Sequence, residues 1–509
     1  MKTDVLIIGA GPTGLMLANQ LNRFGIDFII IDHKPSPSIE SRALSVSPRS
    51  MEIYQQLELS DKIQAQSKVM KGVKMFNNGK VIAHVNLETI GSEFTDFGRL
   101  TTTFEQNKNE VLLLENLQEK GKNVLWNQEF VSYTETKDNI ETVVKNTTDN
   151  ATETINSKYL VGCDGAKSAI RHRVGFGFEG GTYENRFYVA DVNLTWAYGY
   201  DDVSMMPEKG IFVAFFPLQE KNKVRIIGTL PKEFENQENI EFDKIEEKIK
   251  EVSKINFSIE KLNWFSTYRV HHRCVDAFSK GRIFLAGDAA HIHSPAGGQG
   301  MNTGLQDAHN LGWKMAFVLK GFSNPNLLNT YNEERLPYAQ ALVKSTDKGF
   351  LFMSGHDWWI RILRSYIILP LFGIVMKYKA PAVQLFKYLS QLFYSYSKLS
   401  LAINATKQNL KFKAGDRLPL IESGYFKKLI SPTFHLIRVS DGELSKEEKE
   451  QLNKLFSFEI KIIEEKITPQ WKKFGVKNDL FILIRPDHHI LYVGDTISKE
   501  KMGQYFQNI

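Results

Sequence analysis

The hydrophobic pattern at the N-terminus changes from a short apolar run to helical spacing and back again. Val5 to Ile8 is a continuous apolar run, typical of a strand buried on both faces of a parallel sheet. From Pro12 to Arg23 the apolar residues recur at helical spacing, and Gly25 is positioned to end that helix. Phe28 to Ile31 is the next apolar run. The pattern predicts a βαβ unit at the start of the chain.

Two later stretches alternate between polar and apolar residues, as strands with one buried face do. They cover Val73 to Thr103 and Arg186 to Val270. Helical spacing lies between them from Asn109 to Lys120, followed by strand-like alternation from Val124 to Tyr159. We expect the two separated β-rich stretches to form one domain that is inserted into the first.

The last part of the chain begins after another apolar run, Ile283 to Ala286, and is mainly helical to about Lys411. The tail then alternates β and α patterns and ends in strands at Phe481 to Ile484 and His489 to Val493. We therefore predict an α/β fold class in four parts. They are a discontinuous Rossmann-like nucleotide-binding domain (1–71, 104–182 and 270–345), a β-sheet domain (72–103 and 183–269), a helical connector (346–412) and a C-terminal domain (413–509).

Composition excludes only a few classes of protein. The 509 residues are 42% hydrophobic and 24% charged, and the net charge of +6 is not gathered into a basic block, so we expect no nucleic-acid partner. Two cysteines, Cys163 and Cys274, make a disulfide framework implausible and favour the cytoplasm. The longest apolar run, Tyr366 to Met376, contains Pro370 and is shorter than the ~20 residues that a span requires, so we predict no membrane span.

The first chemical motif is Gly9-Ala10-Gly11-Pro12-Thr13-Gly14, between the first strand and the first helix. Gly9 permits a tight turn, Gly11 lets the backbone approach a pyrophosphate, and Gly14 lets the helix pack close to the strand. The free N–H groups at the helix start favour phosphate. Asp32 ends the second strand, where a carboxylate binds an adenosine ribose, and we add His33 and Lys34 to this predicted cofactor site.

A second string of the same type, Gly175 to Gly180, follows a predicted helix from Ser168 to Val174 and no strand. No carboxylate is suitably placed after it, and we interpret it as a loop. The sequence therefore contains one dinucleotide-binding fold.

Another motif, Tyr159 to Arg171, delivers Asp164 and Gly165 from a buried strand to the start of a helix. That arrangement suits a pyrophosphate approached from a second side. A capped helix after a strand, with no ligand, is the alternative interpretation.

The third motif runs from Gly281 to Ala316. Asp288 ends a strand and is placed to hold a ribityl hydroxyl. The loop at Pro295, Gly298 and Gly300 is too rich in glycine to fill a core, and it leads into a helix that starts near Met301 and Asn302. The positive end of that helix would stabilise a reduced flavin ring. These features favour FAD over NAD as the dinucleotide.

In this order the three motifs resemble the single-component FAD-dependent aromatic hydroxylases of the p-hydroxybenzoate hydroxylase type, whose FAD-binding domain is of the GR2 class. Arg42 resembles an arginine of that family that contacts FAD, and Gln106 resembles a glutamine beside the cofactor. The pattern Tyr331 to Pro337 also recurs there. The resemblance covers roughly the first two thirds of the chain.

The resemblance implies a monooxygenase in which NADPH or NADH reduces FAD, and a flavin C4a-hydroperoxide then hydroxylates an aromatic, phenolic or polyketide-like substrate. It implies no catalytic residue of the protein's own, because the flavin carries the chemistry while the loop at Pro295, Gly298 and Gly300 positions it. Charge alone suggests three residues that could bind NADPH: Arg42, Lys167 and Arg171. Four residues of the β-rich stretch are predicted to line the substrate site, although the phenylalanines could equally be sheet core: Phe212, Phe215, Phe216 and Arg269.

The tail resembles the thioredoxin-like C-terminal domain of the phenol hydroxylase, aromatic polyketide hydroxylase and rifampicin monooxygenase branch. Residues 415–509 contain no cysteine, so dithiol exchange is excluded. The aromatic stretch from Phe350 to Tyr396, which includes Trp358, Trp359, Phe372 and Tyr394, could face lipid, but packing between domains or in a homodimer is favoured over that. The chain is then a monomer or a homodimer. His291 and His293 more often orient a loop than bind a metal, and we predict no metal site.

Other functions stay open at this point. A Baeyer–Villiger monooxygenase would carry a second genuine glycine motif, and a flavin halogenase would carry a WxWxIP segment, and the sequence has neither. An antibiotic-inactivating monooxygenase of the rifampicin or tetracycline type is the main alternative. A protein that binds FAD without turning over is another.

Overall fold

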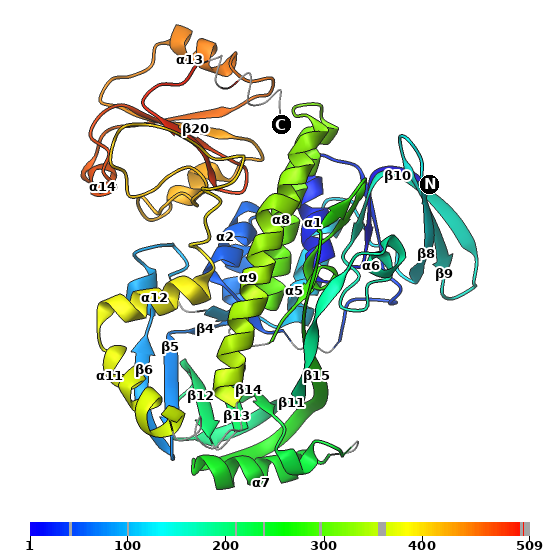
Figure 1. Ribbon diagram of the computed structural model, residues 1–509, viewed down its shortest axis with the longest axis vertical. Helices are drawn as coiled ribbons and strands as arrows, with labels where there is room; N and C mark the ends of the chain where they lie inside the picture. The colour runs from blue at the N-terminus through cyan, green and yellow to red at the C-terminus, as the bar shows by residue number, and fades with distance from the viewer. Residues whose placement is uncertain are drawn as a thin grey trace.

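A computed structural model describes the chain except residues 40–42, 99–100, 209–210, 238–239, 295–297, 355–362, 499–501 and 503–509. The fold is mixed α/β. Figure 1 shows a nucleotide-binding part with its long central helices, a curved sheet beneath it and a separate C-terminal part above it. The predicted positions Arg42 and Pro295, with Trp358 and Trp359, lie outside the described residues.

A seven-stranded sheet forms the nucleotide-binding part, and its central order is β16-β17-β10-β1-β2. The parallel strands are β1 (Lys2–Ile8), β2 (Phe28–Ile31), β10 (Thr152–Gly162) and β17 (Ile283–Leu285). The antiparallel strands are β8 (Gln128–Glu135), β9 (Ile140–Asn146) and β16 (Ser279–Lys280). The predicted βαβ unit is confirmed, because α1 (Pro12–Arg23) joins β1 to β2.

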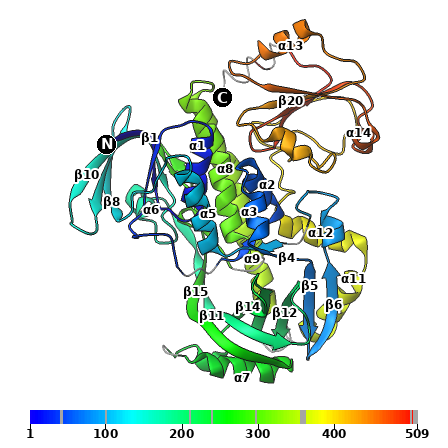
Figure 2. The same cartoon turned by 180° about the vertical axis from the view of Figure 1, so that it is seen from behind.

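Helices cover this sheet on the side of α1. They include α2 (Pro48–Gln56), α3 (Ser60–Ala65), α5 (Gln106–Gln118), α8 (Gly300–Leu319) and α9 (Asn329–Ser354). Figure 2 shows α2, α3 and α5 in front of α8 from behind. The large hydrophobic core of this sheet and these helices continues into the C-terminal part through Phe434, Phe456 and Phe458. A small sheet of β3 (Ser45–Val46), β4 (Lys68–Met70) and β7 (Thr101–Thr103) lies at the lower end of these helices.

The eight-stranded sheet joins the two β-rich stretches, in the order β18-β15-β11-β14-β13-β12-β5-β6. Its strands from the first stretch are β5 (Gly72–Asn77) and β6 (Lys80–Asn86), and β5 pairs in parallel with β12 (Asp202–Glu208). The others are β11 (Phe178–Trp196), β13 (Ile211–Pro217), β14 (Lys223–Thr229), β15 (Phe257–Val275) and β18 (His291–Ile292). Since β11 begins at Phe178, the predicted loop over 175–180 is wrong for its last three residues, which pair with β15.

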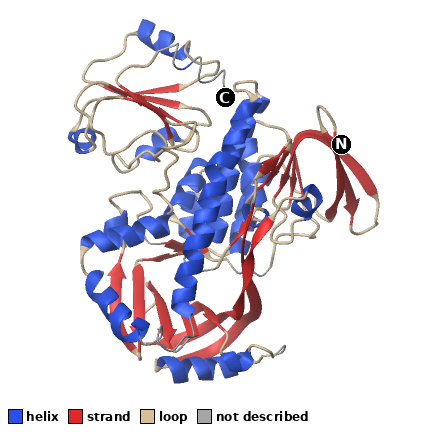
Figure 3. Ribbon diagram, viewed as in Figure 1, coloured by secondary structure: helices blue, strands red, loops and turns tan. Residues whose placement is uncertain are grey.

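One face of the eight-stranded sheet is covered by α7 (Phe242–Ser253), through a core that includes Phe242, Ile245 and Ile249. We call this the α7 face, and the opposite one the inner face. Figure 3 shows α7 beneath the sheet and the lower end of α9 above it. The inner face therefore looks toward the nucleotide-binding part.

After α9 the chain continues through a π-helix, η4 (Leu363–Ile368), then α11 (Leu369–Val375) and α12 (Lys379–Ser390). These helices pack beside β5 and β6 through Leu369, Ala382 and Phe386. No single described helix has the length and apolar composition of a membrane span. The segments Tyr366–Val375 and Lys379–Ser390 meet that description only as a pair, which is bent by 102°.

The C-terminal part is a five-stranded sheet in the order β19-β23-β22-β20-β21. The strands are β19 (Ile403–Ala405), β20 (His435–Val439), β21 (Lys461–Glu465), β22 (Leu480–Ile484) and β23 (Ile490–Gly494), with helices α13 (Lys446–Asn453) and α14 (Pro469–Lys473). β20 is parallel to β21 and antiparallel to β22. The two predicted strands near the end of the chain are confirmed as β22 and β23. A separate core around Trp471 holds this part together.

Candidate cofactor site

The three sequence motifs meet at one edge of the seven-stranded sheet. Strands β1, β10 and β17 are neighbours and run parallel, so their carboxyl ends lie at the same edge. Gly9 follows β1, Asp164 follows β10 and Asp288 follows β17. This edge, hereafter the cofactor edge, is where α/β sheets bind their ligands.

The glycines of the first motif differ in what surrounds them. A Cβ on Gly9, whose φ is +104°, would lie 2.4 Å from the carbonyl oxygen of Cys163, and one on Gly14 would lie 1.9 Å from that of Gly9. The chain's own backbone therefore requires both glycines. A Cβ on Gly11 would meet none of the described residues within 4 Å. Gly11 precedes Pro12, the first residue of α1, so the open space lies at the helix N-terminus, where phosphate is favoured.

Asp32 is buried at the end of β2, and the backbone fixes its carboxylate. Oδ2 accepts a hydrogen bond from the Ala10 N–H at 2.7 Å, and Oδ1 accepts one from the Lys34 N–H at 2.9 Å. Lys34 Nζ lies 3.8 Å from both Asp32 and Glu110, while His33 is exposed. A carboxylate oxygen accepts more than one hydrogen bond, so Asp32 retains capacity for a ribose hydroxyl.

Asp164 fits both interpretations of the second motif. Its Oδ2 accepts hydrogen bonds from the N–H groups of Ala169 and Ile170, at 2.7 and 3.2 Å, at the start of α6 (Ala169–Val174). Its Oδ1 is buried and has no hydrogen-bond partner among the residues that the structure describes. Burial raises the pKa of Asp164. One oxygen thus caps α6 while the other is left for a ligand, next to Gly165, whose φ of +76° turns the chain.

The basic residues of the second motif are not equivalent. Arg171 is buried, and it donates hydrogen bonds to the carbonyl oxygens of Ala289 at 2.9 Å and Ala166 at 2.8 Å. Its guanidinium carbon lies 3.8 Å from the centroid of the Phe178 ring. Arg171 therefore fastens the loop after β17 to the second motif, and its suggested role in binding NADPH is wrong. Lys167 is exposed.

The third motif packs directly against the first. Cβ atoms on Gly287 and Gly304 would lie 2.5 and 2.3 Å from Oγ1 of Thr13, so Thr13 fits between the loop after β17 and α8. The Asp288 side chain is open to solvent, yet burial raises its pKa. Asp288 is thus available to a ligand at this edge.

The loop before α8 is tied to the small sheet by one residue. Asn302 Nδ2 donates hydrogen bonds to the carbonyl oxygens of Ser45 and Gly298, both at 2.8 Å, and Asn302 Oδ1 accepts one from the Ser47 N–H at 2.8 Å. Gly298 has a φ of +61°, and a Cβ there would lie 2.8 Å from Ser45 Cβ. Asn302 thus holds the described part of the loop against the small sheet.

The remaining predicted residues lie near this loop. Met301 Sδ accepts a hydrogen bond from Asn109 Nδ2 of α5, and the two atoms are 3.8 Å apart. Gln106, the first residue of α5, is half-buried and donates to Glu110 at 2.9 Å. Gly300 begins α8, and a Cβ on it would lie 3.7 Å from His293 Nε2. The structure therefore brings Gln106, Gly300 and Met301 to the region of the loop, and their contact with a cofactor stays a prediction.

Sequence reasoning missed a buried cluster behind the cofactor edge. Asp307 of α8 is bonded to His291 Nε2 at 2.7 Å, to Arg335 Nε at 2.7 Å and to the Gly287 N–H at 3.1 Å. Burial alone would raise the pKa of Asp307, but the charge of Arg335 and the contact with His291 lower it. His291 thus orients the loop. Among the described residues, no group of three or more His, Cys, Asp or Glu side chains could hold a metal ion.

The signal for part of this cluster was in the sequence. Arg335 belongs to the pattern Tyr331 to Pro337, and Tyr331 donates a hydrogen bond to the Leu285 carbonyl oxygen at 2.8 Å at the end of β17. His293 is also surrounded by protein. Its Nδ1 lies 2.7 Å from the Ser294 carbonyl oxygen, and burial lowers its pKa to about 4.

Both cysteines of the chain lie close to the same edge. Cys163 follows β10, and Cys274 of β15 pairs with His291 of β18. Both thiols are buried, and neither forms a disulfide. Burial raises the pKa of Cys163 well above its usual value and that of Cys274 to about 12.

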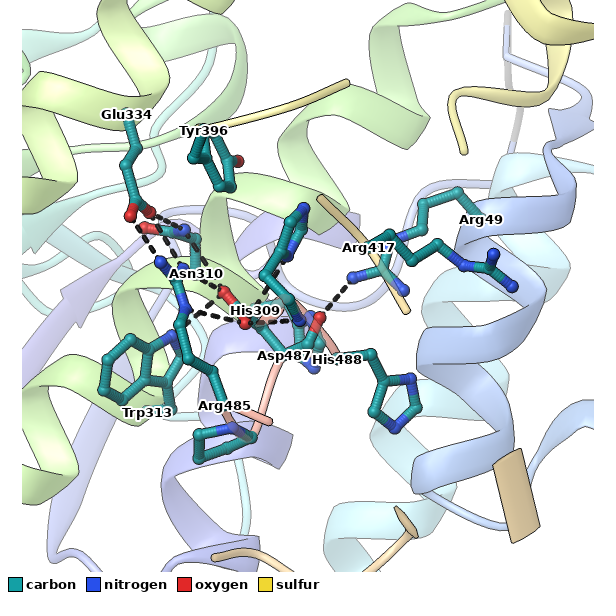
Figure 4. A network of polar contacts seen from close by, with 12 residues as sticks. Arg49, His309, Asn310, Trp313, Glu334, Tyr396, Arg417, Arg485, Asp487 and His488 are labelled. Atoms are coloured by element: carbon teal, nitrogen blue, oxygen red, sulfur yellow. Dashed lines mark hydrogen bonds and ion pairs between the residues drawn. The ribbon is translucent and has the colours of Figure 1, made fainter. Parts of the chain in front are cut away.

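The C-terminal part contacts the nucleotide-binding part through a buried polar network (Figure 4). The β22–β23 turn brings Arg485 against Glu334 of α9 and against Asp487. Lys314 Nζ of α8 lies 2.8 Å from the other side of Glu334. Burial would raise the pKa of Glu334, but Arg485 and Lys314 outweigh it and lower that pKa to about 2. The carboxylate is therefore ionised and permanently paired.

A second group of charges continues this network toward α2. Glu52 lies between Arg49 at 3.0 Å and Arg417 at 2.8 Å, and Arg417 belongs to the segment that enters the C-terminal part. Arg49 also donates to the Asp487 carbonyl oxygen at 2.6 Å. We call the whole set the docking network: Arg49, Glu52, Lys314, Glu334, Arg417, Arg485 and Asp487. Arg335 connects it to the cluster at Asp307, because its NH1 donates to Tyr396 OH at 3.1 Å and the Tyr396 ring centroid lies 5.5 Å from the guanidinium carbon of Arg485.

Two of the four predicted substrate residues are wrong. Phe215 is fully buried on the α7 face, where its ring lies 5.8 Å from that of Phe257. Arg269 is exposed and shares a face with Phe265, which contacts Phe242 of α7. Side chains alternate along a strand, so Phe212 and Phe216 point to the inner face, and Phe216 packs against the cluster beside β5. These two stay predictions.

With this geometry established, comparisons with known proteins identify the family. The model of the family described as "FAD binding domain" matches residues 2–346. A flavin-dependent monooxygenase of Mycobacteroides abscessus is 32% identical over 432 residues, which is 82% of this chain and 84% of that protein. The chain belongs to the FAD-dependent aromatic hydroxylases. The predicted resemblance is confirmed, and the protein is a flavoprotein monooxygenase that binds FAD.

Other relatives and structures of the aromatic hydroxylases agree. Pentachlorophenol 4-monooxygenase of Sphingobium chlorophenolicum is 32% identical over 69% of this chain and 65% of its own length. Rifampicin monooxygenase of Rhodococcus hoagii is 30% identical over 68% of this chain and 70% of its own. The structure of the flavin-dependent monooxygenase PieE, in complex with FAD and substrate, covers 99% of both chains with a TM-score of 0.82 at 19% identity, which shows the shared fold.

The cofactor edge of this aromatic hydroxylase fits FAD. The open space at Gly11 suits a pyrophosphate, and the exposed carboxylate of Asp288, together with Oδ1 of Asp164, which has no partner among the described residues, suits hydroxyl groups. Asp32, at the end of β2, suits the adenosine ribose. These groups would hold the dinucleotide along the edge and would leave its reactive ring toward α8.

Proposed function

We propose that this protein uses NAD(P)H and O2 to hydroxylate an aromatic substrate, phenolic or polyketide-like, between the cofactor edge and the inner face of the eight-stranded sheet. The arrangement of β15 supports this most directly. The strand stays paired with β11 to its end at Val275, and Cys274 pairs with His291 of β18, only a few residues before the loop that leads into α8. The sheet and the cofactor edge are thus joined by one continuous strand.

The inner face has the chemistry of a surface that holds aromatic rings. The rings of Phe187 and Tyr268 stack there with centroids 5.8 Å apart. On the same face Arg225 forms two 2.7 Å contacts with Asp191, so its charge is already neutralised. Apolar walls with few polar groups are typical of sites for small organic ligands. Phe212 and Phe216 would extend this surface toward β13.

FAD supplies the electron transfer from NAD(P)H and the reaction with O2 when it is bound. The protein contributes binding and orientation. Gly11 and Asp32 would hold the adenosine diphosphate, Asp288 the ribityl chain, and Asn302 keeps the loop before α8 in place. Among the described basic residues of the second motif, exposed Lys167 stays a candidate for contact with NAD(P)H.

The C-terminal part supports a further proposal about architecture. The sheet order β21-β20-β22-β23, with β20 parallel to β21 and the next two strands antiparallel, matches a thioredoxin-like core. With no cysteine in residues 415–509, its contribution to the enzyme is docking through the network at Arg485. The fourfold domain division stays a prediction, as do a cytoplasmic location and a monomeric or homodimeric assembly.

The test is a turnover assay on the purified FAD-loaded protein. NADPH oxidation would be measured with a simple phenol, an aromatic polyketide and rifampicin, hydrogen peroxide would be counted, and products would be examined by mass spectrometry. We expect an addition of one oxygen atom to a phenol or polyketide. Modification of rifampicin alone would favour antibiotic inactivation. A yellow protein that oxidises NADPH no faster with any candidate would overturn the hydroxylase proposal.

The substrate surface has its own matched pair of variants. Phe216→Ala, on the inner face, should raise KM or increase peroxide release with little loss of stability, because Phe216 is half-buried. Leu262→Ser changes an exposed apolar residue elsewhere in the same sheet and should leave turnover unchanged. Equal kinetics for both variants would place the substrate elsewhere.

A further inference from the structure

The outer surface of η4, α11 and α12 exposes more apolar side chains than any comparable part of the described chain. Fifteen large hydrophobic residues are more than a third exposed among the residues that the structure describes, and eight of them lie between Leu363 and Phe393. Single exposed apolar residues need no explanation, whereas a contiguous group marks an interaction site. In Figure 1 α11 and α12 lie at the outer side of the molecule, beside β5 and β6.

The helical stretch formed by η4 and α11 is apolar on two opposite faces. Leu369 and Gly373 are buried against the sheet, where a Cβ on Gly373 would lie 2.2 Å from the Ile82 carbonyl oxygen of β6. Ile367, Leu371 and Ile374, spaced by four and three residues, form the outward stripe, and each is 54% or 55% exposed. A helix that is apolar all round is normally enclosed. The protein therefore encloses only one side of it.

Aromatic residues and lysines surround the outward stripe. Tyr366 and Tyr378 are 72% and 67% exposed, at the two ends of the helical stretch. Lys377 is exposed beside Tyr378, and Lys379 pairs with Glu93 at 2.6 Å. Tyrosines and lysines at the border of an apolar surface are typical of proteins that lie in a membrane interface.

The charge of this segment identifies the partner. The whole chain has 64 Lys and Arg against 58 Asp and Glu, but no Asp or Glu occurs from residue 358 to residue 415. The same 58 residues contain nine basic residues, of which Arg364, Lys377, Lys379 and Lys387 lie in the stretch from η4 to α12, and the others are Arg361, Lys398, Lys407, Lys411 and Lys413. An anionic lipid surface complements both the charge and the apolar stripe.

A second copy of the chain fits this surface less well. In a symmetric dimer the same patch would face itself. Because the segment has no acidic residue of its own, Lys377 would then face cations of its copy. An anionic surface of another molecule complements Lys377 better than a second copy of this segment does.

Insertion across a bilayer does not fit the geometry. At about 1.5 Å of rise per residue, each of the two helical segments is much shorter than the ~30 Å hydrocarbon core. They also meet at 102°, and their inner sides are held in the protein core by Leu369 and Phe386. Shallow burial of the outward stripe needs no rearrangement.

We propose that the outer surface of η4, α11 and α12 binds the anionic surface of a lipid bilayer, with the stripe at Ile367, Leu371 and Ile374 lying in the interface. The enzyme would then work as a peripheral membrane protein. This inference is independent of the substrate, since it rests on residues outside the cofactor edge and the inner face.

Vesicle sedimentation of the FAD-loaded protein tests the proposal. We expect binding to vesicles of phosphatidylglycerol and phosphatidylcholine, at least about tenfold weaker binding to phosphatidylcholine alone, and weakening by salt. The triple variant Ile367→Ser, Leu371→Ser, Ile374→Ser should lose about tenfold or more in binding. The control Val131→Ser, at an exposed apolar site on β8, should bind as the parent does. FAD absorbance and NADPH oxidation should be unchanged in all of these variants.

Two further measurements keep the test decisive if the triple variant folds poorly. Lys377→Glu with Lys398→Glu, both at exposed positions, should weaken binding to anionic vesicles about tenfold. A polarity-sensitive dye on Tyr378→Cys should shift to the blue with such vesicles, whereas the same dye on Val131→Cys should not. No binding to anionic vesicles, equal binding by the variants, or a dimer that the triple variant converts to monomers without any vesicle binding would each overturn the proposal.

Discussion

The cofactor edge and the docking network both contain carboxylate groups with buried oxygen atoms, but these groups serve opposite purposes. In the docking network each buried carboxylate meets a cation of the protein, as Glu334 meets Arg485 and Lys314. At the cofactor edge, as far as the structure describes the chain, Oδ1 of Asp164 is buried without a partner and nothing lies within 4 Å of a Cβ on Gly11. Because an unsatisfied buried polar group is costly, the first arrangement is complete in itself. We propose that the second is completed by the dinucleotide.

The largest expected effect comes from breaking the docking network. Arg485→Ala would leave Glu334 and Asp487 buried without their main partner, and we expect a loss of about 3–5 kcal/mol in the stability of the C-terminal part. Urea unfolding followed by tryptophan fluorescence measures it, since Trp313 and Trp471 lie on the two sides of the interface.

Arg438→Ala is the matched control for this prediction. Arg438 of β20 also pairs with an aspartate, Asp479, at 3.4 Å, but Asp479 is 54% exposed. An exposed pair contributes about 1 kcal/mol or less. Similar losses in the two arginine variants would contradict the distinction between a buried network and a surface ion pair.

Lowering the pH should cause much of the stability loss expected for Arg485→Ala, without any mutation. The pKa of Glu334 falls from 4.5 to about 2 in the folded protein, so its pairing stabilises the fold above pH 4.5 and is lost as the pH falls toward 2. The shift corresponds to roughly 3 kcal/mol. Unfolding measured between pH 5 and pH 2 should show this loss, and Glu334→Gln should flatten that part of the pH profile. An unchanged profile in the variant would assign the acid sensitivity to other carboxylates.

Two alanine substitutions in the glycine motif distinguish a glycine that the fold requires from a glycine that the ligand requires. In Gly14→Ala the new Cβ would collide with the Gly9 carbonyl oxygen, so we expect a loss of about 1–3 kcal/mol in stability as well as of FAD. In Gly11→Ala the Cβ enters open space, so stability without FAD should be unchanged while FAD affinity falls about tenfold or more. Thermal unfolding with and without FAD distinguishes them. A Gly11→Ala protein that binds FAD normally would place the pyrophosphate elsewhere.

The smallest expected effect concerns Asp32. Asp32→Asn keeps the shape of the side chain but removes the charge that aligns the Ala10 and Lys34 N–H groups and that would accept ribose hydroxyls. FAD affinity should fall by roughly tenfold, or about 1.4 kcal/mol. Fluorescence quenching of added FAD measures it. The control Asp27→Asn, at an exposed residue, should bind FAD normally.

Local signals in the sequence were sufficient for the elements and insufficient for their contacts. The bounds of α1 and β2 were predicted correctly, because a glycine turn, a helical period and an apolar run follow one another without ambiguity. Phe215 was misplaced because a period of two shows which side chains share a face but not which face meets the cofactor. Both faces of β13 are apolar, so the sequence has no signal that distinguishes them.

The charge of a residue also did not predict its role in the structure. Arg171 has the sequence position of a phosphate ligand, yet it binds two backbone carbonyl oxygens. Asp307 and Arg335 are 28 residues apart, and their contact depends on how α8 packs against α9. No short-range pattern encodes such a contact. The recurring segment from Tyr331 to Pro337 was recognised only by its resemblance, and the hydrogen bonds of Tyr331 and Arg335 now give it a physical reason.

The burial of the two thiols has a consequence for the lifetime of the enzyme. Hydrogen peroxide, which flavin monooxygenases release when turnover is uncoupled, oxidises thiolates far faster than thiols. Cys163 and Cys274 lie beside the cofactor edge, and burial keeps both of them protonated at neutral pH. These are the only cysteines in the chain. The thiols of the enzyme are therefore shielded from oxidation by its own by-product.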